Sequence, residues 1–357
     1  MIIEILDKQT LKVKSYGHIL TDEYKIKRDI YTIQYTNFKV LNVEVAKGDI
    51  VYVKEIKYLG VVNDKQKTSI DNAYQIQCAD LDELINLEIP ADTRTGTLST
   101  SIALYLTQLF NSNSDPKQNL PMFKFINDSD VQGTISFDKD KSTTVHDLLV
   151  KAFEIAGIYH TFNITTDEFG QYNKIEMHLK SDNSDPITIK TDFSAIKTFS
   201  YSDNLTQNEN KIEFFLNSDD GGGGTVANAV RYLLDDGTIT DNANATGRIL
   251  PVKTKIKYYQ ASSVDNNENY FDETAAQELK GNQYNHLIEL TMLTQNNIAV
   301  PLKDFDLYSK ITFVDNNISY HTVLTGYEQT QNKSVITLIF GKVRKGLIER
   351  IKRGIKW

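Results

Sequence analysis

Histidines are the residues of this sequence best suited to bind a metal ion or to transfer protons near neutral pH. No two of them have the spacing that places a pair of ligands on one helix face, and none lies within a recognisable zinc pattern. Isolated histidines of this kind are far more often surface or packed residues than metal ligands. The sequence therefore predicts no metal site and no cofactor at His18, His146, His160, His178, His286 and His321.

Pairs of acidic residues could bind a cation or serve as the two carboxylates of a glycosidase. Asp219-Asp220 stands before four glycines, and Asp235-Asp236 stands before Gly237. Acidic residues beside glycine are more commonly turn residues, because their side chains accept hydrogen bonds from the local backbone. The sequence also lacks a nucleophile elbow, a phosphate-binding loop and a complete calcium loop. We therefore expect no catalytic residue.

Residues 342–357 differ in charge from the rest of the chain. Seven basic residues and one acid give this segment a charge of +6, whereas the remaining residues carry −14. Apolar residues recur at helical spacing, which predicts a basic amphipathic helix weakened by Gly346 and Gly354. Docking on a neighbouring subunit is favoured over a membrane surface or a phosphate backbone, because five apolar anchors can order a short segment by packing. The predicted interaction residues are Lys342, Arg344, Lys345, Leu347, Ile348, Arg350, Ile351, Lys352 and Arg353.

The bulk composition narrows the class of protein. At about 100–200 residues per domain, the 357 residues predict two or three domains. Hydrophobic residues make up 40% and charged residues 24%, as in folded soluble proteins. No run approaches the roughly 20 apolar residues that cross a bilayer, so we expect no membrane span. A net charge of −8 disfavours general nucleic-acid binding.

The single cysteine, Cys78, excludes an intramolecular disulfide framework. We interpret it as a small buried residue and not as a nucleophile, because it lies among apolar neighbours. Folding in a reducing cytoplasm is therefore expected.

Short alternating segments predict a first β domain over residues 1–85. Residues 38–45 are rich in β-branched side chains and close to alternating, and residues 50–53 and 58–62 continue the pattern after polar segments. Short strands with polar turns between them are typical of a small barrel or sandwich.

The pattern becomes mixed over residues 86–195, which we predict to form an α/β insertion domain. Apolar residues at helical spacing predict a helix that begins after Gly96-Thr97, with Ser99 and Thr100 as candidate caps. A second helix is predicted from Thr144, and Gly157 would end it in the left-handed conformation. Two strands are predicted to follow this helix.

A second β domain is predicted from residues 196–216 and 285–341, and the resemblance given below implies that it and residues 1–85 are β-barrels. Residues 47–53 and 308–314 both place an alternating strand after a polar segment, and a further strand follows each. This similarity indicates two related β domains, one toward each end of the chain.

Residues 217–284 form the second part of the predicted insertion region. Asp236-Gly237 lies between two apolar runs and predicts a hairpin turn. Residues 275–280 predict a helix, and the pattern leaves open whether it ends there or continues past Gly281.

Four segments of the chain resemble prophage tail proteins of Gram-positive siphophages, also called tail-associated lysin (Tal) proteins. The N-terminal part of that family is similar to the baseplate hub of contractile-tailed phages. The segments are NKIEFFL (210–216), YLLDDGTI (232–239), RILPV (248–252) and ITLIFGKVRKGL (336–347).

The resemblance implies an α+β, mainly β fold with two tube-like β-barrel domains and α/β insertions, like a baseplate hub. Three chains with two barrels each would form a pseudo-sixfold ring that adapts the sixfold tail tube to a threefold tip. Such a ring would also close or gate the DNA channel. Many relatives carry a hydrolase domain, but only sixteen residues follow Gly341, so we expect no enzymatic activity.

The implied partners are two further copies in a homotrimer and a distal tail protein ring. Contacts with the tape-measure protein and receptor-binding proteins are also implied, whereas genomic DNA would pass through without sequence-specific binding. The implied location is the tip of a virion tail, after folding in the cytoplasm of the bacterial host.

The alternative hypothesis is a phage-derived cell-wall hydrolase or a carbohydrate-binding module. A hydrolase would use acidic turn residues such as Asp235 and Asp236. A binding module would use some of the 19 tyrosines and 16 phenylalanines. These aromatic residues are spread through strand patterns instead of clustering in one loop, which argues against the binding module.

Overall fold

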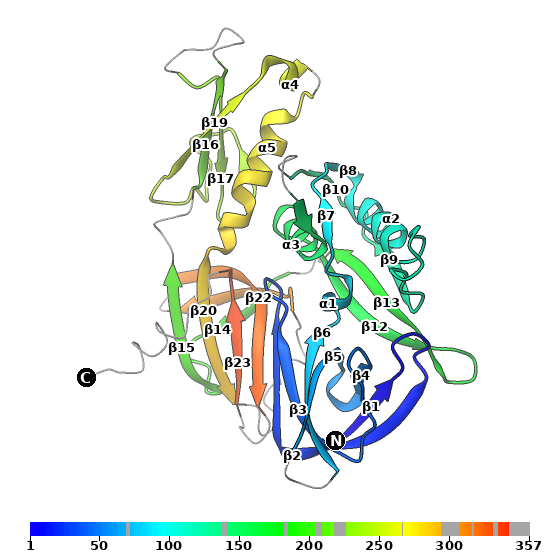
Figure 1. The fold of residues 1–357 in the computed structure, drawn as a ribbon. Helices are drawn as coiled ribbons and strands as arrows, with labels where there is room; N and C mark the ends of the chain where they lie inside the picture. The colour runs from blue at the N-terminus through cyan, green and yellow to red at the C-terminus, as the bar shows by residue number, and fades with distance from the viewer. Residues whose placement is uncertain are drawn as a thin grey trace. The chain divides into compact units, whose positions relative to one another are not determined.

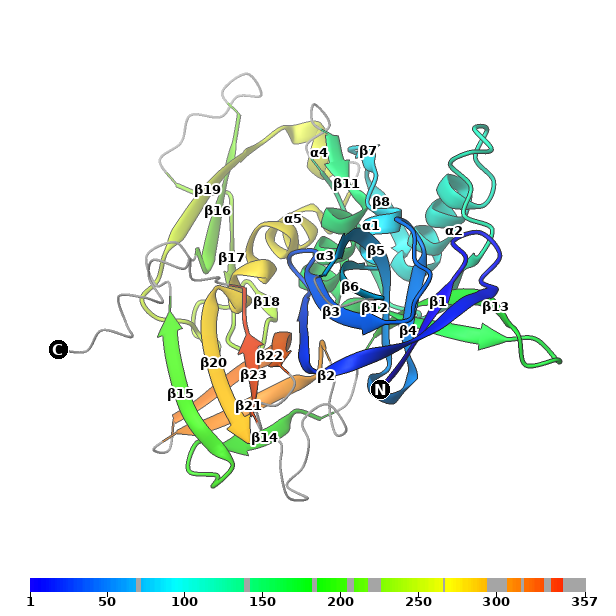
Figure 2. The ribbon, with the colours of Figure 1, turned by 60° about the horizontal axis from the view of Figure 1, so that its bottom comes forward.

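A computed structural model describes most of the chain, and Figures 1 and 2 show it from two sides. The structure is mainly β with a few short helices, which confirms the fold class predicted from the alternating pattern. The described residues are 1–68, 72–137, 142–181, 185–203, 209–217, 226–265, 267–293, 307–315, 318–330 and 335–342. Two compact units divide the chain: unit 1 comprises Met1–Ser184, Leu293–Leu307 and Gly326–Thr337, and unit 2 comprises Asp185–Met292, Tyr308–Thr325 and Leu338–Trp357.

Unit 1 holds the first thirteen strands and three of the α-helices. The strands are β1 (Ile2–Leu6), β2 (Val13–Asp29), β3 (Tyr35–Leu41), β4 (Ile50–Val53), β5 (Tyr58–Lys67), β6 (Ala73–Asp80), β7 (Glu88–Pro90), β8 (Arg94–Thr97), β9 (Phe123–Asp128), β10 (Gln132–Ile135), β11 (Ser142–Thr144), β12 (Ile158–Thr166) and β13 (Tyr172–Ser181). The helices are the 3-10 turn η1 (Lys54–Ile56), α1 (Asp82–Ile85), α2 (Leu98–Phe110) and α3 (Val145–Ala156).

Six strands of unit 1 are linked by a closed circuit of antiparallel pairings. Strand β1 pairs with β2 and β4, β4 with β5, β5 with β6, β6 with β3, and β3 with β2. Alternate residues of each strand point to one side, so Thr36, Phe38 and Val40 of β3 are all buried. Such a circuit is compatible with a small barrel. The β-barrel predicted over residues 1–85, and a tube built from two barrels per chain, stay predictions.

One hydrophobic core joins this strand circuit to the α/β part of unit 1. Leu6 of β1 and Ile50 of β4 belong to the same buried cluster as Leu98 and Leu106 of α2 and Leu148 of α3. In Figure 1 helices α2 and α3 lie beside the three-stranded sheet β12-β13-β9. Each fully buried side chain of this size contributes about 1.5–3 kcal/mol. The domain boundary between residues 85 and 86 remains a prediction. Buried residues from both sides of this boundary belong to the same core.

Helix α3 shows how local sequence sets an element. Thr144 accepts a hydrogen bond from the backbone of Asp147, and the Asp147 side chain in turn accepts one from the backbone of Thr144. This reciprocal capping satisfies two free N–H groups of the first turn. Gly157 ends the helix at φ 65°, as predicted, because glycine adopts the left-handed conformation without a Cβ clash.

A buried ion pair lies inside the strand circuit. Arg28 of β2 donates a hydrogen bond to Asp80 at the end of β6 and another to the carbonyl of Leu59, at 3.0 Å. Its guanidinium also lies 4.9 Å from the ring centre of Tyr58. The Arg28 and Asp80 side chains are only 18% and 6% exposed. Burial raises the pKa of Asp80 to about 6, although the charge of Arg28 acts in the opposite direction.

A second buried pair connects α1 to the strand β12. Nε2 of His160 lies 2.8 Å from Oδ1 of Asp82, with side chains 9% and 17% exposed. Burial alone would raise the pKa of Asp82, but His160, with His146 and Arg28, holds that pKa below its ordinary value. We call Arg28, Asp80, Asp82 and His160 the buried charge cluster.

Unit 2 holds the remaining strands and helices. The strands are β14 (Ile187–Lys190), β15 (Ile196–Asp203), β16 (Lys211–Leu216), β17 (Ala229–Leu233), β18 (Ile239–Thr240), β19 (Thr254–Tyr259), β20 (His286–Leu293), β21 (Lys310–Asp315) and parts of β22 (Ile318–Thr330) and β23 (Val335–Phe340). The helices are α4 (Ala261–Asp265), α5 (Tyr270–Leu279) and the 3-10 turn η3 (Lys280–Tyr284).

Unit 2 contains a small four-stranded sheet covered on one face by α5, as Figure 1 shows. Its order is β18-β17-β16-β19, and Ile212 and Phe214 of β16 pack against Ala275 and Leu279 of α5. The hairpin predicted at Asp236-Gly237 is confirmed, because it connects the antiparallel strands β17 and β18. Elsewhere in this unit β15 pairs with β20, and β21 pairs with β14 and β22.

The helix predicted over residues 275–280 is part of α5, which ends at Leu279 and does not continue past Gly281, because a 3-10 turn and then strand β20 follow it. Two predicted details were wrong. The strand predicted to reach residue 45 ends at Leu41, since Asn42 adopts φ 56° and breaks the extended backbone. Neither Ser99 nor Thr100 caps α2, because the Ser99 hydroxyl donates to the carbonyl of Ser129 and the Thr100 hydroxyl accepts from the Asn127 amide.

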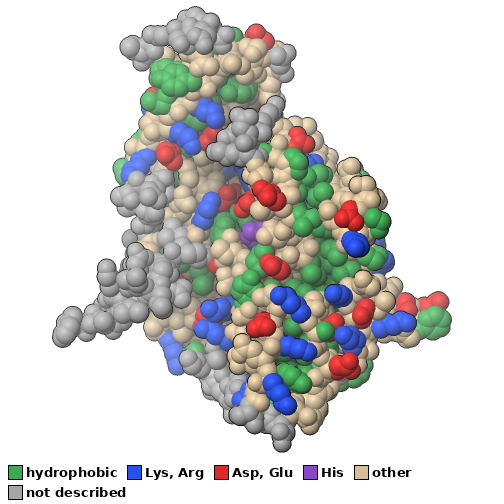
Figure 3. All heavy atoms as spheres, in the orientation of Figure 1, with side chains coloured by type: hydrophobic (Ala, Val, Ile, Leu, Met, Phe, Trp, Pro, Cys, Tyr) green, Lys and Arg blue, Asp and Glu red, His purple; other side chains and the backbone are tan. Residues whose placement is uncertain are grey.

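Charges of both signs are mixed on the surface of the first six strands, as the face in Figure 3 shows. Lys14 lies 2.8 Å from Asp49, and Lys25 lies 2.6 Å from Glu328. Mixed charges produce no extended positive potential. This face therefore offers no broad basic surface for a nucleic acid.

Candidate functional site

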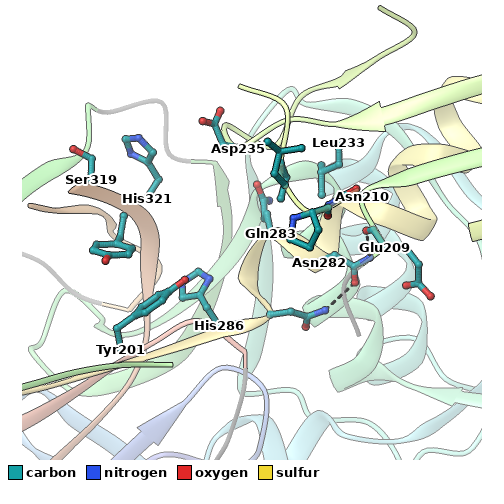
Figure 4. Close-up of a pocket in the computed structure, with 15 residues that line it drawn as sticks. Tyr201, Glu209, Asn210, Leu233, Asp235, Asn282, Gln283, His286, Ser319 and His321 are labelled. Carbon is teal, nitrogen blue, oxygen red and sulfur yellow. Dashed lines mark hydrogen bonds between the residues drawn. The ribbon is translucent and has the colours of Figure 1, made fainter. Parts of the chain in front are cut away.

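A polar pocket of about 390 Å³ lies in unit 2. Strands β15, β20 and β22 provide Tyr201, His286 and His321 to its wall. Figure 4 shows Tyr201 and His321 on one side, Glu209 on the opposite side and Asp235 between them. The pocket is therefore assembled from strands of the sheet and from segments next to the small β16–β19 sheet.

Segments that are far apart in the sequence meet at this pocket. Residues 210–216, 232–239 and 248–252, which carried the resemblance to tail proteins, each contribute to its wall. The turn before β20 adds Asn282 and Gln283. The convergence explains why no single stretch of sequence marked the site.

Two asparagines of the wall hold neighbouring segments together. The Asn210 amide donates to the carbonyl of Pro251 at 2.9 Å, and its oxygen accepts from the backbone of Lys253 at 3.0 Å. The Asn282 amide donates to the carbonyl of Glu209 at 2.8 Å and its oxygen accepts from Asn285 at 2.9 Å. These side chains position the wall, and their hydrogen bonds are largely used within the protein.

Other polar side chains of the wall have capacity left for a ligand. Within the described part of the chain, no hydrogen bond or ion pair engages the carboxylates of Glu209 and Asp235 or the side-chain amide of Gln283. Neither Lys nor Arg occurs among the described residues that line this pocket. The open groups therefore offer two acceptor carboxylates and one amide that both donates and accepts.

Three glycines with positive φ make room for other atoms of the wall. A Cβ on Gly247 (φ +85°) would lie 2.5 Å from the Asp235 carboxylate, and one on Gly237 (φ +82°) would collide with Oε1 of Gln283. A Cβ on Gly341 (φ +82°) would collide with the backbone carbonyl oxygen of His286. Since only glycine fits these positions without strain, the backbone is shaped closely around the pocket residues.

Aromatic rings form the other part of the wall. The ring centres of Tyr201 and Tyr320 are 4.6 Å apart, and Tyr201 is 38% exposed. Nε2 of His286 lies 2.7 Å from the Thr322 hydroxyl, which holds the ring in place. The pocket thus combines apolar ring faces with open carboxylates.

A second cavity of about 340 Å³ adjoins the first. Both are lined by Asp235, Gln283 and His321, and the second also by Asp236 and Lys310. A ligand that extends from one cavity into the other would pass Asp235, Gln283 and His321.

The two acidic pairs predicted to be turn residues have different outcomes. Asp236 accepts a hydrogen bond from the backbone of Thr238 at 2.8 Å, and its bonds to Thr238 lower its pKa. It is therefore a turn residue, as interpreted, whereas Asp235 faces the pocket. Asp219-Asp220 lies outside the described residues.

The predicted C-terminal interaction segment is almost entirely outside the described residues. Among the nine predicted interaction residues, Lys342 alone is described, and its backbone donates to the carbonyl of Tyr284 at 2.5 Å. The interaction surface predicted from Arg344, Lys345, Leu347, Ile348, Arg350, Ile351, Lys352 and Arg353 stays a prediction.

Sequence reasoning missed Tyr201, Gln283 and His286 as members of a site. Isolated aromatic, amide and histidine residues carry no local signal, because their neighbours in space come from distant segments. The glycines at positions 237, 247 and 341 were the available signal, since glycine marks backbone that needs positive φ or close approach.

The described residues offer neither a metal-binding cluster nor a membrane-spanning helix. In this part of the chain, no group of three His, Cys, Asp or Glu residues could hold a metal ion. Nor does a described helix have the length and apolar character needed to cross a membrane.

Two solved structures have the same fold. Prophage tail protein gp18 from Listeria monocytogenes EGD-e matches with a TM-score of 0.57 at 11% identity, over 98% of this chain and 97% of that one. The 43 kDa tail protein of prophage MuSo2 from Shewanella oneidensis matches with a TM-score of 0.53 at 14% identity, over 96% and 98%. The chain therefore has the fold of prophage tail proteins, as the resemblance implied. No protein-family model and no curated protein matches the sequence.

Proposed function

We propose that this chain is a non-enzymatic structural subunit of a phage or prophage tail, the hub between tail tube and tail tip. The observation that carries the proposal is the likeness to a prophage tail protein over 98% of this chain and 97% of that one. A match of this extent includes the α/β part and the small β16–β19 sheet as well as the other strands. Fold alone does not define function, so the role needs its own test.

The proposed assembly is a homotrimeric ring that adapts a sixfold tail tube to a threefold tip and closes or gates the DNA channel. Repeated architecture within the chain supports this proposal. Strand β4 is followed by its antiparallel partner β5, and β21 by its antiparallel partner β22. Two related strand domains per chain would give six in a trimer, which matches a sixfold neighbour.

The proposed partners are a distal tail protein ring, the tape-measure protein and receptor-binding proteins. Genomic DNA would pass through the ring without sequence-specific contacts. The proposed location is the virion tail tip, after folding in the host cytoplasm. Residues 342–357 would dock between subunits through their apolar stripe.

The molar mass in solution tests this proposal. Light scattering on a size-exclusion column should give a mass near three times 40.6 kDa, alone or after addition of a distal tail ring. A chain that lacks residues 343–357 should keep its circular dichroism spectrum but lose trimer mass. Intact trimers with lost liposome binding would instead favour a membrane role for the segment. A monomer at all concentrations without affinity for the tail ring would contradict the hub.

A further inference from the structure

We propose that the pocket of unit 2 binds a neutral, linear oligosaccharide. The inference is independent of the tail-hub function, because it rests on the chemistry of the pocket wall. It concerns binding without turnover and assigns no catalytic step.

The open polar groups match the hydroxyl groups of a sugar. Each hydroxyl donates one hydrogen bond and accepts others, and carboxylates accept while a primary amide does both. Glu209, Asp235 and Gln283 supply these groups, and no described residue engages them. Several such bonds would fix the orientation of a ligand in a pocket of this size.

The charge of the wall disfavours an anionic ligand. Glu209 and Asp235 line the first cavity, and none of its described lining residues is Lys or Arg. A phosphate or carboxylate ligand would lie near like charge without a compensating cation, which is unfavourable. In the adjoining cavity Asp235 and Asp236 outnumber Lys310.

The tyrosines provide an apolar surface beside these polar groups. Tyr201 is 38% exposed, and its ring centre lies 4.6 Å from that of Tyr320. A tyrosine ring combines an apolar face with a polar tip. A pyranose ring has the complementary arrangement, with C–H groups on its faces and hydroxyls around its edge.

The pair of cavities favours a chain of sugars over a single unit. Their volumes are about 390 and 340 Å³, and Asp235, Gln283 and His321 line both. A linear oligosaccharide would fill one cavity and extend past these shared residues into the other. Gly237 and Gly247, which admit Gln283 and Asp235, set the position of two of the shared side chains.

Calorimetric titration of the full-length protein tests the inference. The probes are tetrasaccharides of β-1,4-linked N-acetylglucosamine and of α-1,4-linked glucose, their monosaccharides, and a lysine-rich peptide. At least one tetrasaccharide should bind with a Kd of about 1 mM or tighter, and roughly tenfold more tightly than its monosaccharide. Binding by the peptide in place of every saccharide would overturn the proposed ligand class.

Substitutions of pocket residues test whether the oligosaccharide binds in the pocket. Tyr201→Ala and Asp235→Asn should each weaken binding at least about tenfold. The first removes the ring face, and the second replaces a charged acceptor oxygen by an NH2 group that cannot accept a hydrogen bond. Asp235→Asn preserves shape at an exposed position, so it remains informative where Tyr201→Ala fails to fold. Tyr258→Ala is the matched control, because Tyr258 is 64% exposed on β19 and does not line the pocket. Equal weakening by the control, or no saccharide binding at all, would overturn the inference.

Discussion

Acidic side chains have opposite surroundings in the two units. In unit 1, Asp80 and Asp82 are buried and each lies against a basic partner, Arg28 or His160. In unit 2, Glu209 and Asp235 line a cavity, and no described residue bonds to their carboxylates. Buried carboxylates need their partners to offset desolvation, so the first arrangement connects elements of the fold. Carboxylates that remain hydrated at a pocket wall can exchange water for a ligand instead.

The largest effect is expected when the buried ion pair is broken. Arg28→Met leaves Asp80 buried without its counter-ion and should lower the free energy of unfolding by about 3–5 kcal/mol at neutral pH. Burial already raises the pKa of Asp80 to about 6. A raised pKa favours the folded state while the group is protonated, so the loss should shrink as pH falls below about 6. Denaturant titrations at about pH 7.5 and about pH 5 would measure both effects.

The double variant Arg28→Met/Asp80→Asn is the control for this effect. It replaces the lone buried carboxylate by a neutral amide and should recover much of the stability at neutral pH. If the double variant is as unstable as Arg28→Met, the loss comes from packing around Arg28 and not from an unpaired charge.

A smaller effect is expected at the second buried pair. His160→Gln should cost roughly 1.5–3 kcal/mol, because Asp82 loses a hydrogen-bonding partner in a buried position. The pKa of Asp82 is lowered in the folded state, so its contribution exists above the ordinary pKa and is lost as pH falls through the folded value. His160→Gln should therefore unfold at a higher pH during acid titration.

His178→Gln provides the matched control in the same unit. His178 lies 2.6 Å from Asp128, but the two side chains are 21% and 38% exposed. Water screens such a pair, so its loss should cost less than about 1 kcal/mol. Equal costs for the two histidine variants would show that burial does not distinguish the pairs.

The smallest expected difference is the one between two glycine variants, and it concerns the shape of the pocket. Gly170→Ala and Gly247→Ala both place a Cβ at positive φ, which costs about 1–2 kcal/mol. Gly170 has no atom within 4 Å of that Cβ, whereas at Gly247 it would meet the Asp235 carboxylate at 2.5 Å. Gly247→Ala should therefore be less stable than Gly170→Ala by about a further 1 kcal/mol in thermal unfolding. No difference would mean that Asp235 moves aside freely.

Much of the secondary structure could be predicted because its causes are local. Thr144 and Gly157 delimit α3 through hydrogen bonds and backbone preferences that span a few residues. The Asp236-Gly237 hairpin and the strand at residues 50–53 follow from equally short patterns. Predictions failed where a partner far along the chain sets the role of a side chain. The Ser99 hydroxyl, for example, donates to the carbonyl of Ser129, thirty residues away.

By itself, therefore, the sequence determined the mainly β class, the positions of the principal elements and the burial of Cys78. Only the tertiary structure decided that Asp82 meets His160, and that Asp235 faces a pocket while Asp236 closes a turn. Hydrophobic periodicity and turn chemistry act within a few residues, and so can be recognised in a sequence. The surroundings of a carboxylate depend on segments that packing brings together from distant parts of the chain.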